Sequence, residues 1–147
     1  MEELSNFDIE EIYPLFYINL IVCIDHKQLN NYDLVDGSYI INLGNKHWSA
    51  LYVLNKQGFY FDSYGIIYPQ SVKIFCPNVI YSDDTIQSLN SVLCGYFCLY
   101  FLYWMTNKFS INLKKTFNLF RSQFDDNEKR NNKILQSLIK NIISKNY

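Results

Sequence analysis

The chain has 147 residues, of which 49% are hydrophobic, 18% are aromatic and 18% are charged, and its formal net charge is −1. This length fits one domain over residues 1–147, which can bury a core without disulfide or metal cross-links. The aromatic content excludes intrinsic disorder, and the near-zero net charge argues against a dedicated nucleic-acid-binding protein.

The first half of the chain predicts a short helix followed by strands. Ser5–Asp8 has the form of a capping box that begins a helix, and Pro14 limits that helix. The apolar residues 16–24 fit either a strand or a loop. Three segments rich in β-branched and aromatic residues are predicted strands, namely 39–43, 48–54 and 59–62. A hairpin turn is predicted at residues 55–58, and apolar residues on both strand faces predict a sheet that is covered on both sides.

The second half of the chain is predicted to be mainly helical. A short helix follows Pro69, and Val79–Tyr81 fits a further strand. Three longer helices are predicted from apolar periodicity, at about residues 91–106, 113–123 and 126–144. The apolar run 92–105 is too short to cross a bilayer, so we expect a buried helix and no membrane association. The expected fold class is α+β, with a small mixed or antiparallel sheet and packed helices.

Four cysteines are present: Cys23, Cys76, Cys94 and Cys98. They are enough for two disulfides, but the first residues lack the form of a signal peptide, so we expect reduced thiols in an intracellular setting. A zinc site would need two ligands besides Cys94 and Cys98, and the two histidines lack paired spacing. We therefore expect no metal.

Charge is unevenly distributed along the chain. Residues 1–107 contain four basic and eleven acidic residues, a net charge of −7, whereas residues 108–147 contain nine and three, a net charge of +6. The basic side chains either solvate the outer faces of the last two predicted helices or form a surface for DNA or another polyanion.

Cys94 is a candidate nucleophile because it lies near the start of an apolar helix. The dipole and the N–H groups of a helix N-terminus favour a thiolate, and Gly95 adds little bulk that would shield it. A nucleophilic thiol also needs a base that a third group orients. The candidate bases are His47, just before a predicted strand, and His26, in a polar stretch typical of a surface loop. The alternative for Cys94 is a packed core thiol.

Asp62 is the candidate partner of His47. With a turn at residues 55–58, Asp62 falls opposite Leu51, on the same sheet face as His47 but four residues short of it along the strand. A bulge or a bent strand end would have to close that gap. The backbone N–H of Cys94 and the side-chain amide of Gln87 are candidate donors to an oxyanion, although a solvated surface residue is the alternative for Gln87.

Three segments together resemble the adenovirus-type maturation proteases (adenain) and the related Ulp-type peptidases. They are GNKHWSALYV, YFDSYG and IQSLNSVLCGYFCLYFL, in the family's order of His, acid, Gln and Cys. The resemblance covers about Gly37 to Asn107. It implies a cysteine peptidase with a papain-like site in a permuted order. Carried over to matching positions, the expected roles are Cys94 as nucleophile, His47 as base, Asp62 as orienting acid, Gln87 in the oxyanion hole, and Trp48 and Gly95 lining the site.

The resemblance is greatest to proteases of virophages, Maverick/Polinton elements and large DNA viruses. It implies cleavage of capsid or virion precursors after Gly-containing motifs, in the host cytoplasm or nucleus (the virion factory) and in the virion. Two alternatives remain: a Ulp-type isopeptidase acting on ubiquitin-like proteins, and a non-catalytic capsid- or DNA-associated protein that uses basic residues 108–147.

The resemblance has two departures from the adenoviral pattern. Adenoviral enzymes usually carry Glu where this chain has Asp62, which is closer to the SUMO-protease branch. Neither Cys23 nor Cys76 matches the cysteine that joins the adenoviral enzyme to its peptide cofactor. We therefore expect a monomer that requires no cofactor, with activation by DNA or a peptide as the alternative.

Overall fold

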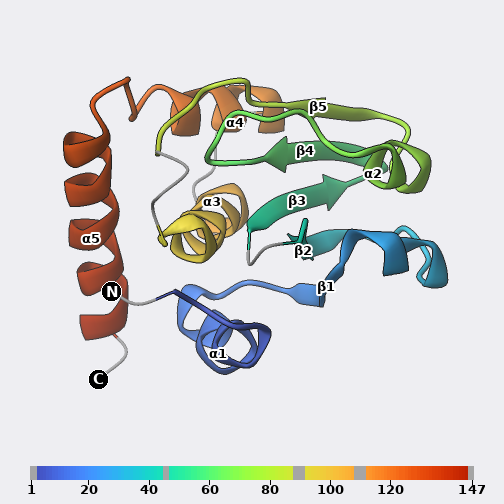
Figure 1. Ribbon diagram of the computed structural model, residues 1–147, viewed down its shortest axis with the longest axis horizontal. Helices are drawn as coiled ribbons and strands as arrows, with labels where there is room; N and C mark the ends of the chain where they lie inside the picture. Colours follow the sequence, from blue (N-terminus) through green and yellow to red (C-terminus); the bar gives the residue numbers. More distant parts are fainter. Residues whose placement is uncertain (1–2, 45–46, 88–91, 108–111, 146–147) are drawn as a thin grey trace.

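A five-stranded sheet organises the protein, whose computed structural model describes residues 3–44, 47–87, 92–107 and 112–145. The strands follow sequence order across the sheet: β1 (Leu20–Asp25), β2 (Gly37–Asn42), β3 (Trp48–Leu54), β4 (Gln57–Phe61) and β5 (Val79–Tyr81). The three central strands are antiparallel, and each edge strand is parallel to its neighbour. The predicted α+β class with a small mixed sheet is confirmed (Figure 1).

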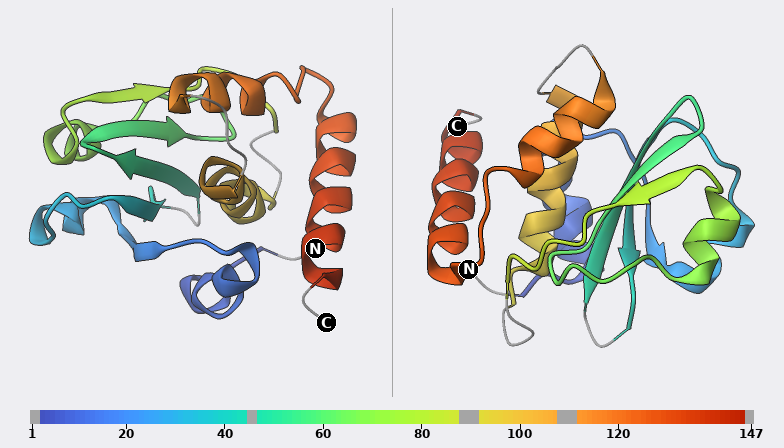
Figure 2. Two further views of the ribbon diagram at one scale, coloured as in Figure 1. Left: turned by 180° about the vertical axis from the view of Figure 1, so that it is seen from behind. Right: turned by 90° about the horizontal axis from the view of Figure 1, so that it is seen from above.

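Helices cover both faces of this sheet, as predicted. The helices on one side are α1 (Asn6–Ile12), α3 (Cys94–Asn107), α4 (Leu113–Arg121) and α5 (Glu128–Ser144). On the other side α2 (Gln70–Phe75) packs on the short 3-10 helix η2 (His26–Asn31). A second 3-10 helix, η1 (Tyr13–Phe16), follows α1 and contacts α3 and α5. The right-hand view of Figure 2 shows the order of layers as α5, α3, sheet and α2.

Alternate residues of each strand enter two separate cores. Ile40 and Ala50 join the core under α3, whereas Tyr39 and Leu51 join the core under α2. This alternation follows from the two-residue period of a strand. Because both faces are apolar and covered, the ends of the central strands are the places where polar side chains can gather.

The helix α3 is the centre of the larger core. Nine of its fourteen residues are buried, which agrees with the prediction of a helix buried on most sides. It packs against β3 and also contacts α4 and α5. None of the described helices combines the length and the apolar character needed to cross a membrane.

Most predicted elements lie close to the observed ones. The capping box is present, since the Ser5 hydroxyl accepts from the Asp8 N–H and the Asp8 carboxylate accepts from the Ser5 N–H. The strands predicted at residues 48–54 and 79–81 have the bounds of β3 and β5, and the segment left open at 16–24 contains most of β1. Helix α3 begins at Cys94, so the prediction of helix at Val92 and Leu93 was wrong, while residue 91 lies outside the described residues.

The hairpin between β3 and β4 is tighter than predicted. Only Asn55 and Lys56 form the turn, with φ angles of 50° and 67°. Positive φ at both positions is typical of a two-residue type I′ turn. Gln57 and Gly58, which were predicted to belong to the turn, are the first residues of β4. The predicted pairing of the two strands was therefore wrong.

Candidate active site

His47 and Asp62 meet where β3 begins and β4 ends. The observed register brings Asp62 next to Ser49, not opposite Leu51 as predicted. Because the turn is shorter than predicted, Asp62 lies two residues from His47 along β3 and not four. β3 and β4 pair without a bulge. The Nε2 of His47 lies 2.9 Å from the Oδ1 of Asp62.

The charges of this pair are set by burial and by close partners. The Asp62 side chain is fully buried and that of His47 is 13% exposed. Asp62 Oδ1 also accepts a hydrogen bond of 2.8 Å from the Tyr64 backbone N–H, as a buried carboxylate requires. Burial alone lowers the pKa of His47, but hydrogen bonds to Asp62 and Cys94, together with their negative charges, raise it to about 9. These partners therefore favour the protonated form of the imidazole.

Cys94 is the second side chain that interacts with the imidazole. Asp62 engages Nε2, while Nδ1 is buried and makes no hydrogen bond of normal geometry within the described residues, so Nδ1 is the nitrogen left to interact with the thiol. The Phe97 N–H bonds to the Leu93 carbonyl, which places Cys94 in the first turn of α3. The positive end of the helix dipole there stabilises a negative sulfur.

Gln87 is a buried residue that lies close to Tyr64. It is 2% exposed, and neither of its amide atoms makes a hydrogen bond of normal geometry in the described part of the chain. It nevertheless lies close enough to Tyr64 to lower the pKa of that hydroxyl against the larger, opposite effect of burial. A buried amide that lacks a hydrogen bond of normal geometry suits a group that gains such a bond when a ligand arrives.

Tyr64 is a residue of the site that the sequence analysis missed. Its ring stacks on the imidazole of His47, with centroids 4.0 Å apart and planes 8° from parallel. Burial, followed by the charge of Cys94, raises the pKa of Tyr64. The stacking restricts the ring plane of His47, which helps to keep its two nitrogens directed at Asp62 and Cys94. The only available signal was the place of Tyr64 two residues after Asp62.

Trp48 and Gly95 both contact the N-terminal segment. Trp48 is 4% exposed, and its indole N–H donates to the Leu4 carbonyl over 2.9 Å. A Cβ added to Gly95 would lie 3.2 Å from the Leu4 side chain. The lack of a side chain at Gly95 thus makes room for Leu4, whereas the sequence analysis had taken it as exposure of the thiol.

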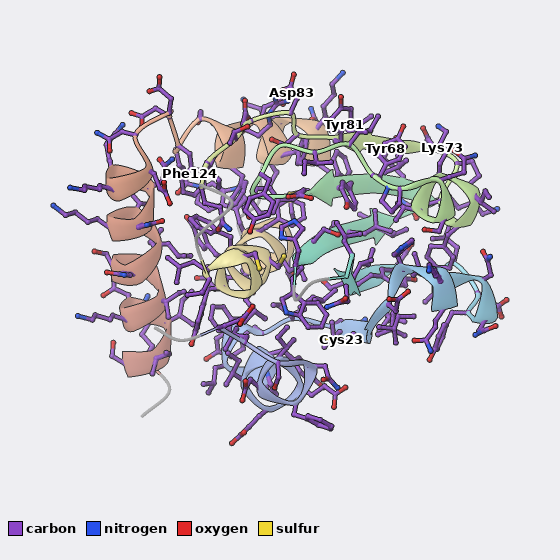
Figure 3. All side chains as sticks on the ribbon, viewed as in Figure 1. Cys23, Tyr68, Lys73, Tyr81, Asp83 and Phe124 are labelled. Atoms are coloured by element: carbon purple, nitrogen blue, oxygen red, sulfur yellow. The ribbon has the colours of Figure 1, made fainter. Side chains whose placement is uncertain are left out.

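A cleft of about 610 Å³ adjoins Trp48 on the side of β1. Its lining includes Cys23, labelled in Figure 3, and the carboxylates Glu3 and Asp25, and no Lys or Arg is among its described lining residues. Neither His47 nor Cys94 lines it. The cleft is therefore next to the candidate site and extends away from it.

The remaining candidate residues lie elsewhere. His26 bonds through Nδ1 to the Ser71 hydroxyl at 2.7 Å, which joins η2 to α2 away from Cys94. No disulfide joins the four cysteines, all of which are described. Burial and the nearby Glu10 raise the pKa of Cys23 to about 12, and burial raises the pKa of Cys98 well above its ordinary value. Within the described ranges, no His, Cys, Asp or Glu side chains form a group of three that could hold a metal.

Both arginines of the basic segment 108–147 are engaged in ion pairs. Arg121 pairs with Asp83 and Asp84, and Arg130 pairs with Asp125. The described lysines of α4 and α5 and the one that follows α5 are exposed, while the basic residue at position 108 lies outside the described residues. The basic surface considered from the sequence therefore consists mainly of lysines.

Comparison with known proteins gives matches at the level of structure. The sequence matches no protein-family model and no curated protein. A crystal structure of the selenomethionine form of the ASFV pS273R protease has a TM-score of 0.59 at 15% identity, and a second structure of that protease has a TM-score of 0.58 at 17% identity. The chain has the fold of this protease. Each match covers 88% of this chain and 65% of the pS273R chain, so this chain spans somewhat less than two thirds of the protein it matches.

The likeness to the pS273R protease confirms the expected fold class. The described α+β arrangement, with a mixed five-stranded sheet and several helices, is shared with a protease structure. It is the fold class that the resemblance to adenain-like and Ulp-type peptidases implied.

Proposed function

We propose that the protein is a viral cysteine endopeptidase that cleaves capsid or virion precursor proteins after Gly-containing motifs. What supports the proposal is the interaction of His47 with both the Asp62 carboxylate and the Cys94 thiol, which lies at the N-terminus of α3. The shared fold with the ASFV pS273R protease supports a protease reaction. In this proposal Cys94 is the nucleophile, His47 the proton carrier and Asp62 the group that orients it.

The reaction starts from a Cys94 thiolate and a His47 imidazolium. The helix N-terminus at Cys94 and the pKa of His47, which is raised to about 9, favour this ion pair. The sulfur forms a bond to the scissile carbonyl carbon, and the carbonyl electron pair moves onto its oxygen. The Gln87 amide and the Cys94 backbone N–H donate hydrogen bonds to that oxyanion.

Collapse of the tetrahedral adduct breaks the C–N bond. His47 gives its proton to the leaving amine, and the acyl group stays on Cys94 as a thioester. Neutral His47 then takes a proton from water, and the resulting hydroxide attacks the thioester carbonyl. The second adduct expels the thiolate and releases a carboxylic acid, which restores the original ion pair. Throughout, Asp62 accepts from Nε2–H, so Nδ1 stays directed at the reacting groups.

The same proposal includes the setting of the reaction. The protein would act as a monomer without a required cofactor, in the host cytoplasm or nucleus where virions assemble and in the virion. The exposed lysines of α4 and α5 would provide its contact with DNA. A DNA affinity that falls as the salt concentration rises would support such a contact. The cleft beside Trp48 offers space for substrate residues that flank the scissile bond.

The pH dependence of iodoacetamide labelling at each cysteine tests the proposed ion pair. We expect Cys94 to label fastest at pH 7, because the His47 imidazolium stabilises its thiolate. Cys23 should need strongly alkaline pH, because its pKa is raised to about 12. Mass spectrometry of the digested protein gives the rate at each site.

Two histidine variants provide matched controls for this labelling. His47→Ala should slow the labelling of Cys94 at pH 7, because the thiolate loses its cationic partner. His26→Ala should leave the rate unchanged, because His26 bonds to Ser71 and does not contact the site. Equally slow labelling of all four cysteines in the unmodified chain would overturn the proposed ion pair.

Gln87→Ala tests the oxyanion hole. We expect kcat on peptides with Gly before the cleaved bond to fall by about 10²–10³, the usual cost of removing one oxyanion donor. Labelling of Cys94 by iodoacetamide should not change, since alkylation develops no oxyanion. The exposed Gln136→Ala is the control and should keep its kcat. An unchanged kcat in Gln87→Ala would remove Gln87 from the mechanism.

A further inference from the structure

Residues 83–87 are held by the turn that follows β4. The Ser63 carbonyl accepts from the N–H groups of Ile86 and Gln87, at 2.9 and 3.2 Å. The Thr85 hydroxyl donates to the Tyr64 carbonyl at 3.0 Å. Gln87 is thus tied to the turn that also carries the candidate acid and the tyrosine that stacks on the imidazole.

On its other side the segment is held by Asn131 of α5. Asn131 is fully buried, and its Nδ2 donates to the Ile86 carbonyl at 2.9 Å. The same amide is fixed by Asp125, because Nδ2 also donates to the Asp125 carbonyl at 2.7 Å and Oδ1 accepts from the Asp125 N–H at 3.2 Å. Asn131 therefore has both its amide atoms engaged and cannot turn without breaking these bonds.

These contacts fix one peptide unit from both ends. The Ile86 carbonyl and the Gln87 N–H belong to the same planar peptide group. Asn131 holds the carbonyl end, and the Ser63 carbonyl holds the N–H end. The direction in which the Gln87 side chain leaves the backbone depends on the orientation of this plane.

Arg121 of α4 holds the start of the same segment from the surface. Its Nη2 is 2.8 Å from Asp83 and its Nε is 2.7 Å from Asp84; Asp83 lies beside α4 in Figure 3. The Asp83 side chain is 72% exposed, so water screens this ion pair. The buried bonds of Asn131 are therefore the stronger constraint on Gln87.

We propose that Asn131 is a positioning residue for the oxyanion hole, which acts from α5 by fixing the Ile86–Gln87 peptide unit. This inference rests on the proposed function, because it gives the amide of Gln87 a role in catalysis. It also gives the C-terminal helix a part in the chemistry, through the bond of Asn131 to the Ile86 carbonyl.

Asn131→Asp and Asn131→Ser test this role. Both remove the Nδ2 amide that donates to the Ile86 carbonyl, and the Ser variant does so without placing a charge in the core. We expect kcat to fall by about 10-fold to 10²-fold with little change in KM, since small displacements of a positioned group have effects of this size. Cys94 should label with iodoacetamide at its normal rate, because labelling needs the ion pair and not the oxyanion hole.

A double variant separates positioning from general loss of structure. If Asn131 acts through Gln87, Asn131→Ser combined with Gln87→Ala should be no slower than Gln87→Ala alone. A purely structural role would give losses that multiply, together with slower labelling of Cys94, and would overturn the inference. Asn141→Ser, an exposed change on the same helix, should leave kcat unaltered.

The two proposals fail in different ways. If the unmodified chain labels at Cys94 and hydrolyses peptides while the Asn131 variants keep full kcat, only the role of Asn131 is wrong. If the unmodified chain shows neither selective labelling nor hydrolysis, the proposed peptidase function is wrong. Melting temperatures measured for each variant identify a loss of kcat that comes from unfolding at the assay temperature.

Discussion

Cys94→Ala is expected to lower peptide hydrolysis by about 10⁴-fold or more, which is the scale of losses when the nucleophile of such a unit is removed. The sulfur is the only protein atom in the proposed mechanism that forms a covalent bond to the substrate carbon. Cys94 is 3% exposed, and a change from Cys to Ala in a packed position removes one atom, so the fold should persist. Steady-state kinetics and thermal melting measure the two effects separately.

Cys76→Ala is the matched control for this prediction. Cys76 is also buried, but it belongs to the core under α2, on the other side of the sheet. Its loss should leave kcat unchanged and should alter stability about as much as Cys94→Ala does. A Cys94→Ala variant that still cleaves a capsid precursor at the normal rate would contradict the assignment of the nucleophile.

The predictions that succeeded depend on short stretches of sequence. The capping box at Ser5, the bounds of β3 and β5, and the burial of α3 all follow from local composition and periodicity. That His47 and Asp62 lie on the same sheet face could also be predicted, because shortening the turn by two residues leaves each side chain on the same face of the paired strands. Their distance was not, because it depends on the length of the turn.

The turn shows why the register could not be read from composition. The residues from Asn55 to Gly58 include Asn and Gly, which suit either a four-residue or a two-residue turn. The observed turn places Lys56 at a φ of 67°, a conformation that Lys rarely adopts. Only the pairing of the complete strands, with both cores filled, selects this arrangement.

The missed residues owe their roles to contacts between distant parts of the chain. Asn131 lies 45 positions from the Ile86 carbonyl that it binds, and its own helix predicts only an apolar stripe with polar neighbours. Leu4 reaches Gly95 from the other end of the chain. No local sequence pattern predicts either contact. The sequence could therefore indicate the reacting groups but not the residues that hold them in place.

The second large effect is expected at Asp62, and the geometry distinguishes two variants there. Asp62→Ala should lower kcat/KM by about 10⁴-fold, the scale of loss when the acid of such a triad is removed, because the imidazole loses the acceptor that orients it. Asp62→Asn should lose less. A single oxygen, Oδ1, accepts hydrogen bonds from both the His47 Nε2–H and the Tyr64 N–H. Oδ2 is buried and has no hydrogen-bond partner among the described residues. A neutral amide can keep that one oxygen in place.

The pH profile then separates orientation from charge. The negative charge of Asp62 helps to raise the pKa of His47 to about 9, so its removal in Asp62→Asn lowers that pKa. The imidazolium is then lost at lower pH, and the alkaline limb of kcat/KM should move to lower pH while the value at its maximum stays well above that of Asp62→Ala. The exposed Asp33→Asn should leave the profile unaltered. Equal losses in both Asp62 variants would mean that its charge, and not the position of Oδ1, is what His47 requires.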